Sequence, residues 1–98
     1  MNRRKRKPTS PGEILKEEFM VPLGITQKRL ADHIGCDIKV INRIVNSKTS
    51  ITADMAIKLA YTFNTSPEFW LNAQNAVNLY EALQNLEYNL PDILKEAC

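Results

Sequence analysis

The sequence predicts an all-α protein, and three observations point to it. Apolar residues recur at helical spacing in several segments. Helix start signals precede two of these segments, where Ser10 stands before Pro11 and Ser66 before Pro67. The stretch 27–46 has the pattern of two short helices joined by a tight turn. We therefore expect five helices, of which the last is extended.

Length and composition bound the class of protein. A chain of 98 residues suffices for one small domain, and its 44% hydrophobic and 24% charged residues are ordinary for a globular fold. No apolar run approaches the ~20 residues of a membrane span. The basic start MNRRKRKP lacks the apolar segment of a secretory signal, so we expect a cytoplasmic protein with no membrane partner.

The first helix begins with a capping box. Ser10 is the expected N-cap, Pro11 occupies the first helical position, and Glu13 completes the box. Apolar residues follow at helical spacing: Ile14, Leu15, Phe19 and Met20. We expect this helix to end near Val21, before Pro22.

The next two helices form the geometry of a helix-turn-helix. Thr26 and Asp37 are the expected caps, Ala31 is small enough for a close crossing, and Gly35 provides the positive φ of the turn. Ile38, Ile41, Ile44 and Val45 form an apolar stripe on the second helix of the pair. Such a motif holds one helix away from the body so that it enters a DNA major groove.

The opposite face of that helix carries polar side chains: Lys39, Asn42, Arg43 and Asn46. Lysine and arginine donate to guanine O6 and N7, and an asparagine amide pairs with adenine. A solvated helix face is also polar, but this β-branched helix depends on packing against its neighbours. The pattern favours DNA contact.

Two further helices follow. Thr52 precedes residues 53–63, whose buried face comprises Met55, Ala56, Leu59, Ala60 and Phe63. Asn64 is expected in the left-handed conformation that ends this helix. Ser66, Pro67 and Glu68 start a fifth helix that extends to about Asn85.

The apolar residues of the fifth helix occupy more than one stripe. One stripe can pack on the domain, and the other needs a second packing partner. Dimerisation is the favoured solution, and the residues expected in the interface are Trp70, Val77, Tyr80 and Leu83. In the alternative, the tail 87–98 folds back as a short helix that begins at Pro91 and is anchored by Ile93 and Leu94. The expected organisation is a flexible basic arm (1–9), one domain (10–86) and this tail.

Charge is distributed unevenly along the chain. Arg3 to Lys7 are five basic residues in a row, and residues 24–51 contain five basic and two acidic residues. Residues 52–98 contain two basic and six acidic residues. The basic half suits a polyanion, and the acidic half suits a basic partner or solubility. The arm either follows DNA or is a solvated chain end.

The sequence has no signature of an enzyme, a metal site or a cofactor site. Cys36 and Cys98 lack the spacing of zinc or redox motifs. His33 is expected on the surface. We therefore expect no catalytic residue, no metal and no cofactor.

These motifs carry a family resemblance. Thr26 to Lys48 resembles the helix-turn-helix of phage-repressor-like (Xre-type) proteins, and Ile51 to Gln74, ITADMAIKLAYTFNTSPEFWLNAQ, resembles HigA-type antitoxins. With PGEILKEEF at Pro11 to Phe19, the resemblance covers residues 10–83. It implies a five-helix repressor-like fold, a homodimer, a palindromic double-stranded operator, and neutralisation of a HigB-type ribonuclease toxin that cleaves messenger RNA.

The resemblance also implies roles for individual residues. Gln27 matches a backbone-contacting position, whereas Asn46 and Lys48 match a phosphate-facing Asn-Gly-Lys element in which Ser47 replaces the glycine. This replacement puts the shape of that loop in question. The complete set of candidate DNA-binding residues is Gln27, Lys28, Lys39, Val40, Asn42, Arg43, Asn46 and Lys48.

The resulting hypothesis is a dimeric repressor that is also the antitoxin of a toxin-antitoxin module and represses its own operon. One alternative is an Xre-type regulator without a toxin partner. A second is a protein-binding module that does not bind an operator.

Overall fold

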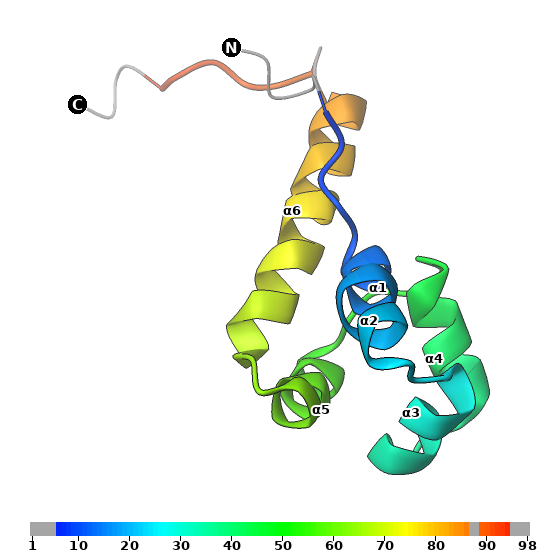
Figure 1. Ribbon diagram of the computed structural model, residues 1–98. Coiled ribbons are helices and arrows are strands. Elements are labelled where there is room, and N and C mark those ends of the chain that lie inside the picture. The colour runs from blue at the N-terminus through cyan, green and yellow to red at the C-terminus, as the bar shows by residue number, and fades with distance from the viewer. Residues whose placement is uncertain (1–5, 87–88, 95–98) are drawn as a thin grey trace.

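A computed structural model describes residues 6–86 and 89–94 of the chain. Its described part is all-α, as predicted. The elements are α1 (Pro11–Ile14), η1 (Leu15–Met20), α2 (Val21–Leu23), α3 (Gln27–Ile34), α4 (Ile38–Val45), α5 (Ala53–Phe63) and α6 (Pro67–Leu86). The first three form one continuous helix, so five helices result. In Figure 1, α1–α5 form a body from which the long α6 projects.

The first helix ends later than predicted. It continues through Pro22 to Leu23 and ends at Gly24, which has a φ of 66°. Residues 15–20 form a π-helix, and the Val21 amide donates to the Lys16 carbonyl five residues earlier. Proline has no N–H and its ring collides with the carbonyl four residues before it in an α-helix. The wider π-helical turn accommodates Pro22 without ending the helix.

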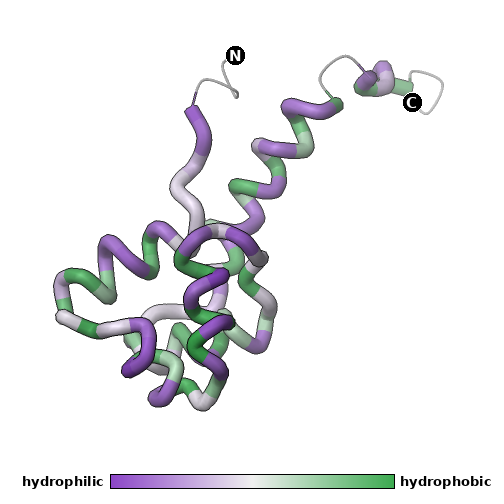
Figure 2. The backbone as a smooth tube through the Cα atoms, turned by 90° about the vertical axis from the view of Figure 1, so that its right-hand side faces the viewer, coloured by the Kyte–Doolittle hydropathy of each residue, from purple (hydrophilic) through white to green (hydrophobic). Residues whose placement is uncertain are grey.

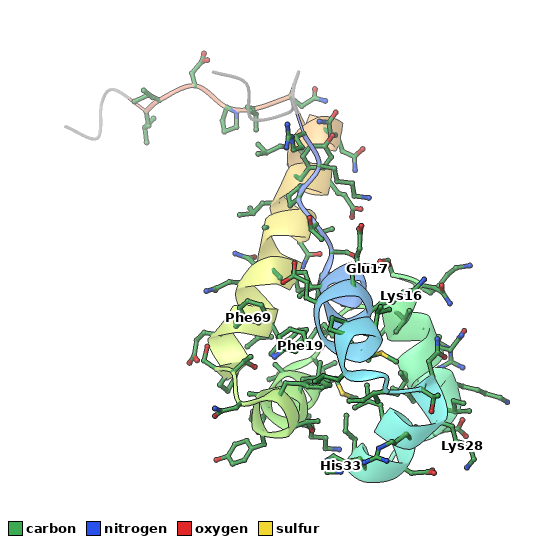
Figure 3. All side chains as sticks on the ribbon, viewed as in Figure 1. Lys16, Glu17, Phe19, Lys28, His33 and Phe69 are labelled. Atoms are coloured by element: carbon green, nitrogen blue, oxygen red, sulfur yellow. The ribbon has the colours of Figure 1, made fainter. Side chains whose placement is uncertain are left out.

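The core lies where the five helices meet. Its largest fully buried side chains include Leu15, Leu30, Ile41, Leu59 and Trp70. Phe19 packs between the helices, with ring centroids 4.9 Å from Phe63 and 5.4 Å from Trp70. Figure 3 shows Phe19 and Phe69 facing one another between the first helix and α6. These aromatic contacts anchor the first half of α6 to the body.

The helix-turn-helix has its predicted local features. Ala31 is buried at the crossing of α3 and α4. Gly35 has a φ of 88°, which places it in the left-handed region as predicted. Asn64 likewise ends α5 in the left-handed conformation.

The described part of the N-terminal arm packs along the protein. Residues 6–9 have no regular secondary structure and run beside α6 (Figure 1). The Lys7 Nζ atom lies 3.5 Å from Glu81 Oε2 on α6, and Val77 is buried beside this segment. The flexibility expected of the arm stays a prediction for residues 6–9, and residues 1–5 lie outside the described residues.

The predicted tail helix does not form in the described residues of the tail. Residues 90–94 have no regular secondary structure, and Ile93 and Leu94 are exposed rather than packed against α6. In Figure 1 this segment leads away from the end of α6. Proline and aspartate form a start signal, but too few apolar contacts follow to stabilise a single turn. Residues 87–88 and 95–98 lie outside the described residues.

Within residues 6–86 and 89–94, none of the helices combines the length and the apolar character that a membrane span requires.

Candidate nucleic-acid interface

Helix α4 presents a polar face to solvent. The Asp37 carboxylate caps its start by accepting the Lys39 amide at 2.8 Å. Ile41 and Ile44 are buried and hold the helix on the body. The candidate residues on the outer face are all exposed, as predicted: Lys39, Asn42, Arg43 and Asn46.

A hydrogen bond joins this face to α3. Gln27 is the first residue of α3, behind the Thr26 cap, whose hydroxyl accepts the Arg29 amide at 3.1 Å. The Asn42 Nδ2 atom donates to Gln27 Oε1 at 3.1 Å. This bond uses Asn42 Nδ2 and Gln27 Oε1, so Asn42 Oδ1 can still accept and Gln27 Nε2 can still donate a hydrogen bond. Both residues line one shallow hollow with Ile38, Lys39 and Arg43.

Lys28 lies on the exposed surface of α3. Its Nζ atom is 3.3 Å from Asp32 Oδ2, one turn later. Both side chains are mostly exposed, and such pairs stabilise a helix by only about 0.3–0.5 kcal/mol. Figure 3 shows Lys28 directed away from the body. The ammonium is thus available to a phosphate at little cost.

Two apolar residues of α4 are neither fully buried nor fully exposed. Val40 is half-buried and packs against the core, and its expected DNA contact stays a prediction. Ile38 was expected in the buried stripe but is 45% exposed on the polar side of the helix. Sequence reasoning missed Ile38 because apolar periodicity assigns isoleucine to the core. Ile38 is the first residue of α4, and the spacing alone does not show whether a neighbouring element covers that position.

The loop after α4 forms a left-handed turn, although Ser47 stands where the related element has glycine. Ser47 has a φ of 57°, the left-handed conformation usually occupied by glycine. The Ser47 amide donates to the Ile44 carbonyl at 3.0 Å, and the Lys48 amide donates to the Arg43 carbonyl at 2.8 Å. This is the Schellman pattern of a helix end. The Ser47 hydroxyl also lies 2.8 Å from that of Ser10. Lys48 and Asn46 are both exposed beside this turn.

The charge around α4 is mainly positive. The exposed basic residues of α3, α4 and the following loop are Lys28, Arg29, Lys39, Arg43 and Lys48. Two acidic residues lie in this region, and each has a local partner: Asp32 pairs with Lys28, and Asp37 caps α4. An exposed, basic and partly amide-lined helix face matches the chemistry of a major groove.

The residues considered for other chemistry form no such site. Burial raises the pKa of the Cys36 thiol, while the nearby Lys58 partly opposes that shift. His33 is exposed, as predicted. Within the part of the chain that the structure describes, no group of three or more His, Cys, Asp or Glu side chains is placed to hold a metal ion.

The expected dimer residues divide into two sides of α6. Trp70 is fully buried inside the protomer, where its Nε1 atom donates to Thr65 Oγ1 at 2.8 Å. Val77 is nearly as buried, so neither side chain offers a surface to a partner and both predictions are corrected. Tyr80 and Leu83 are half-buried. Leu79 and Leu86 are exposed and lie at helical spacing from Leu83.

Comparison with known proteins agrees with this geometry. The model of the helix-turn-helix family matches residues 15–70. The antitoxin HigA-1 of Vibrio cholerae is 46% identical over 81 residues, which cover 83% of this chain and 76% of that protein. An uncharacterised HTH-type transcriptional regulator of Haemophilus influenzae is 45% identical over 83 residues, covering 85% of this chain and 78% of that protein.

A solved structure extends the similarity to three dimensions. The structure of the Pseudomonas aeruginosa antitoxin HigA with the higBA promoter has a TM-score of 0.82 and 35% sequence identity. The match covers 90% of this chain and 100% of that one. The chain therefore belongs to the Xre-type helix-turn-helix family and, within it, to the HigA-type antitoxins.

Proposed function

We propose that this protein is a dimeric, sequence-specific repressor of its own operon and the antitoxin of a HigB-type ribonuclease. The observation that carries the proposal is the exposed polar face of α4, joined to α3 by the Asn42–Gln27 hydrogen bond. A protein that needed α4 only for packing would gain nothing from this arrangement of amides and cations.

The residues divide into two kinds of DNA contact. Lys39, Asn42 and Arg43 lie on the outer face of α4, from which they reach base edges in the major groove. Gln27 and Lys48 lie at the start of α3 and in the loop after α4, where they meet phosphates. Lys28 and Asn46 add polar contacts beside them. The Pseudomonas aeruginosa relative, whose structure includes the higBA promoter, supports a promoter as the target.

Repression follows from occupancy of a palindromic site. Two α4 helices of a dimer enter successive major grooves about 34 Å apart and block the promoter. DNA as the target implies that the protein acts in the cytoplasm. Residues 6–9 run beside α6, where Lys7 Nζ lies 3.5 Å from Glu81 Oε2, and we assign specificity to α4.

The test is a mobility-shift titration with DNA from upstream of the gene. Arg43→Ala is expected to lose about 1–3 kcal/mol on the operator and little on unrelated DNA, if Arg43 pairs with guanine. Lys48→Ala is the matched control, since loss of a phosphate contact weakens both DNAs alike and reduces the salt slope by about one. If the wild-type protein does not change the mobility of this DNA at low salt, the repressor function is contradicted. A module that binds only protein is then favoured.

The toxin partner is the second part of the proposal. Membership of the HigA-type antitoxins and the similarity to antitoxin HigA-1 support it. The Haemophilus influenzae relative is known only as a transcriptional regulator, which leaves regulation without a toxin as the alternative. Co-expression with the product of the neighbouring gene separates the two. Co-purification with a ribonuclease, and rescue of growth that the ribonuclease arrests, are expected. A toxic ribonuclease that this protein neither binds nor inhibits contradicts the antitoxin function.

A further inference from the structure

Ile38 is an exposed isoleucine on a helix face that is otherwise polar. It is 45% exposed and is not among the buried residues of the core. It occupies the first helical position of α4, directly after the Asp37 cap. β-Branched residues have a lower helix propensity than lysine or glutamate, so isoleucine does not favour the helix there either. An aliphatic side chain beside the polar residues proposed to face DNA is available for an apolar contact with a base.

The surroundings of Ile38 define that ligand. It lies one turn before Asn42 and lines the same shallow hollow as Gln27 and Arg43. The hydrogen bond to Gln27 uses one amide hydrogen of Asn42, so Asn42 Oδ1 and the second hydrogen of Nδ2 remain to pair with the N6 and N7 atoms of an adenine. In a helix-turn-helix, the N-terminal residues of the second helix contact the base edges. Ile38 therefore stands at the end of α4 that reaches deepest into the groove.

An aliphatic side chain recognises one base in the major groove. The C5 methyl group of thymine is the only apolar group among the four bases there, whereas cytosine presents an amino donor close to the same place. Isoleucine cannot pair with that donor and would strip water from it. We propose that Ile38 is a specificity-determining residue that packs on the C5 methyl group of a thymine in each operator half-site. This inference rests on the proposed operator binding.

Deoxyuridine provides the test, because it differs from thymine only in the missing methyl group. Each thymine of the operator half-site is replaced in turn by deoxyuridine, and affinity is measured by fluorescence anisotropy. With wild-type protein, one position per half-site is expected to lose about fourfold in affinity, as for one buried methyl group. With Ile38→Ala, the thymine and deoxyuridine operators are expected to bind equally at that position.

A matched control separates this contact from general effects. Leu23→Ala removes an exposed aliphatic side chain away from the α4 face and is expected to retain the full sensitivity to the methyl group. Equal affinity of wild-type protein for thymine and deoxyuridine at every position overturns the inference and leaves operator binding intact. The inference is also overturned if Ile38→Ala keeps the wild-type ratio of affinities for the thymine and deoxyuridine operators. Failure of the wild-type protein to bind any selected DNA overturns the proposed function itself.

Discussion

Gly12 illustrates how a single residue sets the position of the recognition helix. It is buried where the first helix meets the end of α4, and a Cβ atom there would overlap the carbonyl oxygen of Ile44. That carbonyl is backbone, so it cannot move aside as a flexible side chain would. The absence of a side chain at Gly12 thus permits the close approach that holds α4 in place.

Gly12→Ala is expected to destabilise the protein by about 3 kcal/mol, the upper end of the cost of overpacking, because the two helices must separate. Urea unfolding followed by circular dichroism measures this. Gly24→Ala is the control: the added methyl group meets no atom within 4 Å, and only the φ of 66° opposes it, at roughly 1–2 kcal/mol. A larger loss of stability for Gly24→Ala than for Gly12→Ala contradicts the proposed close packing at Gly12.

Cys36 provides a prediction of pH dependence. Because burial raises its pKa, the neutral thiol is favoured in the folded state. Its contribution to stability is fully present below the unfolded pKa and is lost as pH rises through the folded pKa. In a Cys98→Ser variant, iodoacetamide is expected to modify Cys36 more slowly in the folded protein than in urea, with the rate increasing at alkaline pH. Equal rates in both states contradict this.

Side-chain exposure could be predicted for most of α4 but not at its first turn. The spacing of Ile41 and Ile44 identified the buried face, and the polar residues opposite them are exposed. Ile38 was assigned to the buried stripe because apolar residues at helical spacing line one face, but this spacing does not show how far neighbouring elements cover that face. Exposure at the first turn of α4 therefore depends on the tertiary structure.

At the scale of single elements, capping residues predicted where helices start better than prolines predicted where they stop. Ser10, Thr26 and Thr52 cap as expected, each accepting the amide three residues later. Pro22 failed as a stop signal because a π-helical turn absorbs it. The start and stop signals of an α-helix do not specify that local change of hydrogen bonding.

The end of α4 gives a prediction for Ser47. Ser47→Gly relieves the left-handed conformation at the cost of the hydroxyl contact with Ser10, so stability is expected to rise by up to about 1 kcal/mol. Ser47→Ala keeps the backbone strain and loses the contact, so stability is expected to fall by about 0.5–1 kcal/mol. Thermal unfolding of both variants measures these changes. A stabilising Ser47→Ala contradicts the role of the hydroxyl contact.

At the scale of the whole molecule, α6 extends beyond what one protomer covers. The radius of gyration is 16.8 Å, against the ~13 Å expected for a compact domain of this length. Figure 2 shows apolar positions recurring along α6, including the half that projects from the body. The sequence indicated that α6 has more apolar surface than one domain covers. It did not indicate which of these residues are buried and which are exposed. Trp70 and Val77 are buried in the chain, whereas Leu79 and Leu86 are exposed and Leu83 is half-buried.

The dimer proposed for operator binding is expected to use this leucine stripe. Leu79→Glu places a charge where 55% of the side chain is exposed in one protomer, so helix content should not change. If the stripe pairs across a dimer, the buried charge raises the dimer dissociation constant at least tenfold.

Analytical ultracentrifugation measures the dimer dissociation constant. As this constant rises, operator affinity should fall. Leu23→Glu, which adds the same charge at a leucine that is 62% exposed on α2, should remain a dimer. A Leu79→Glu variant that sediments as a dimer with wild-type affinity would place the interface elsewhere. Its two α4 helices would then need another surface to set their spacing on the DNA.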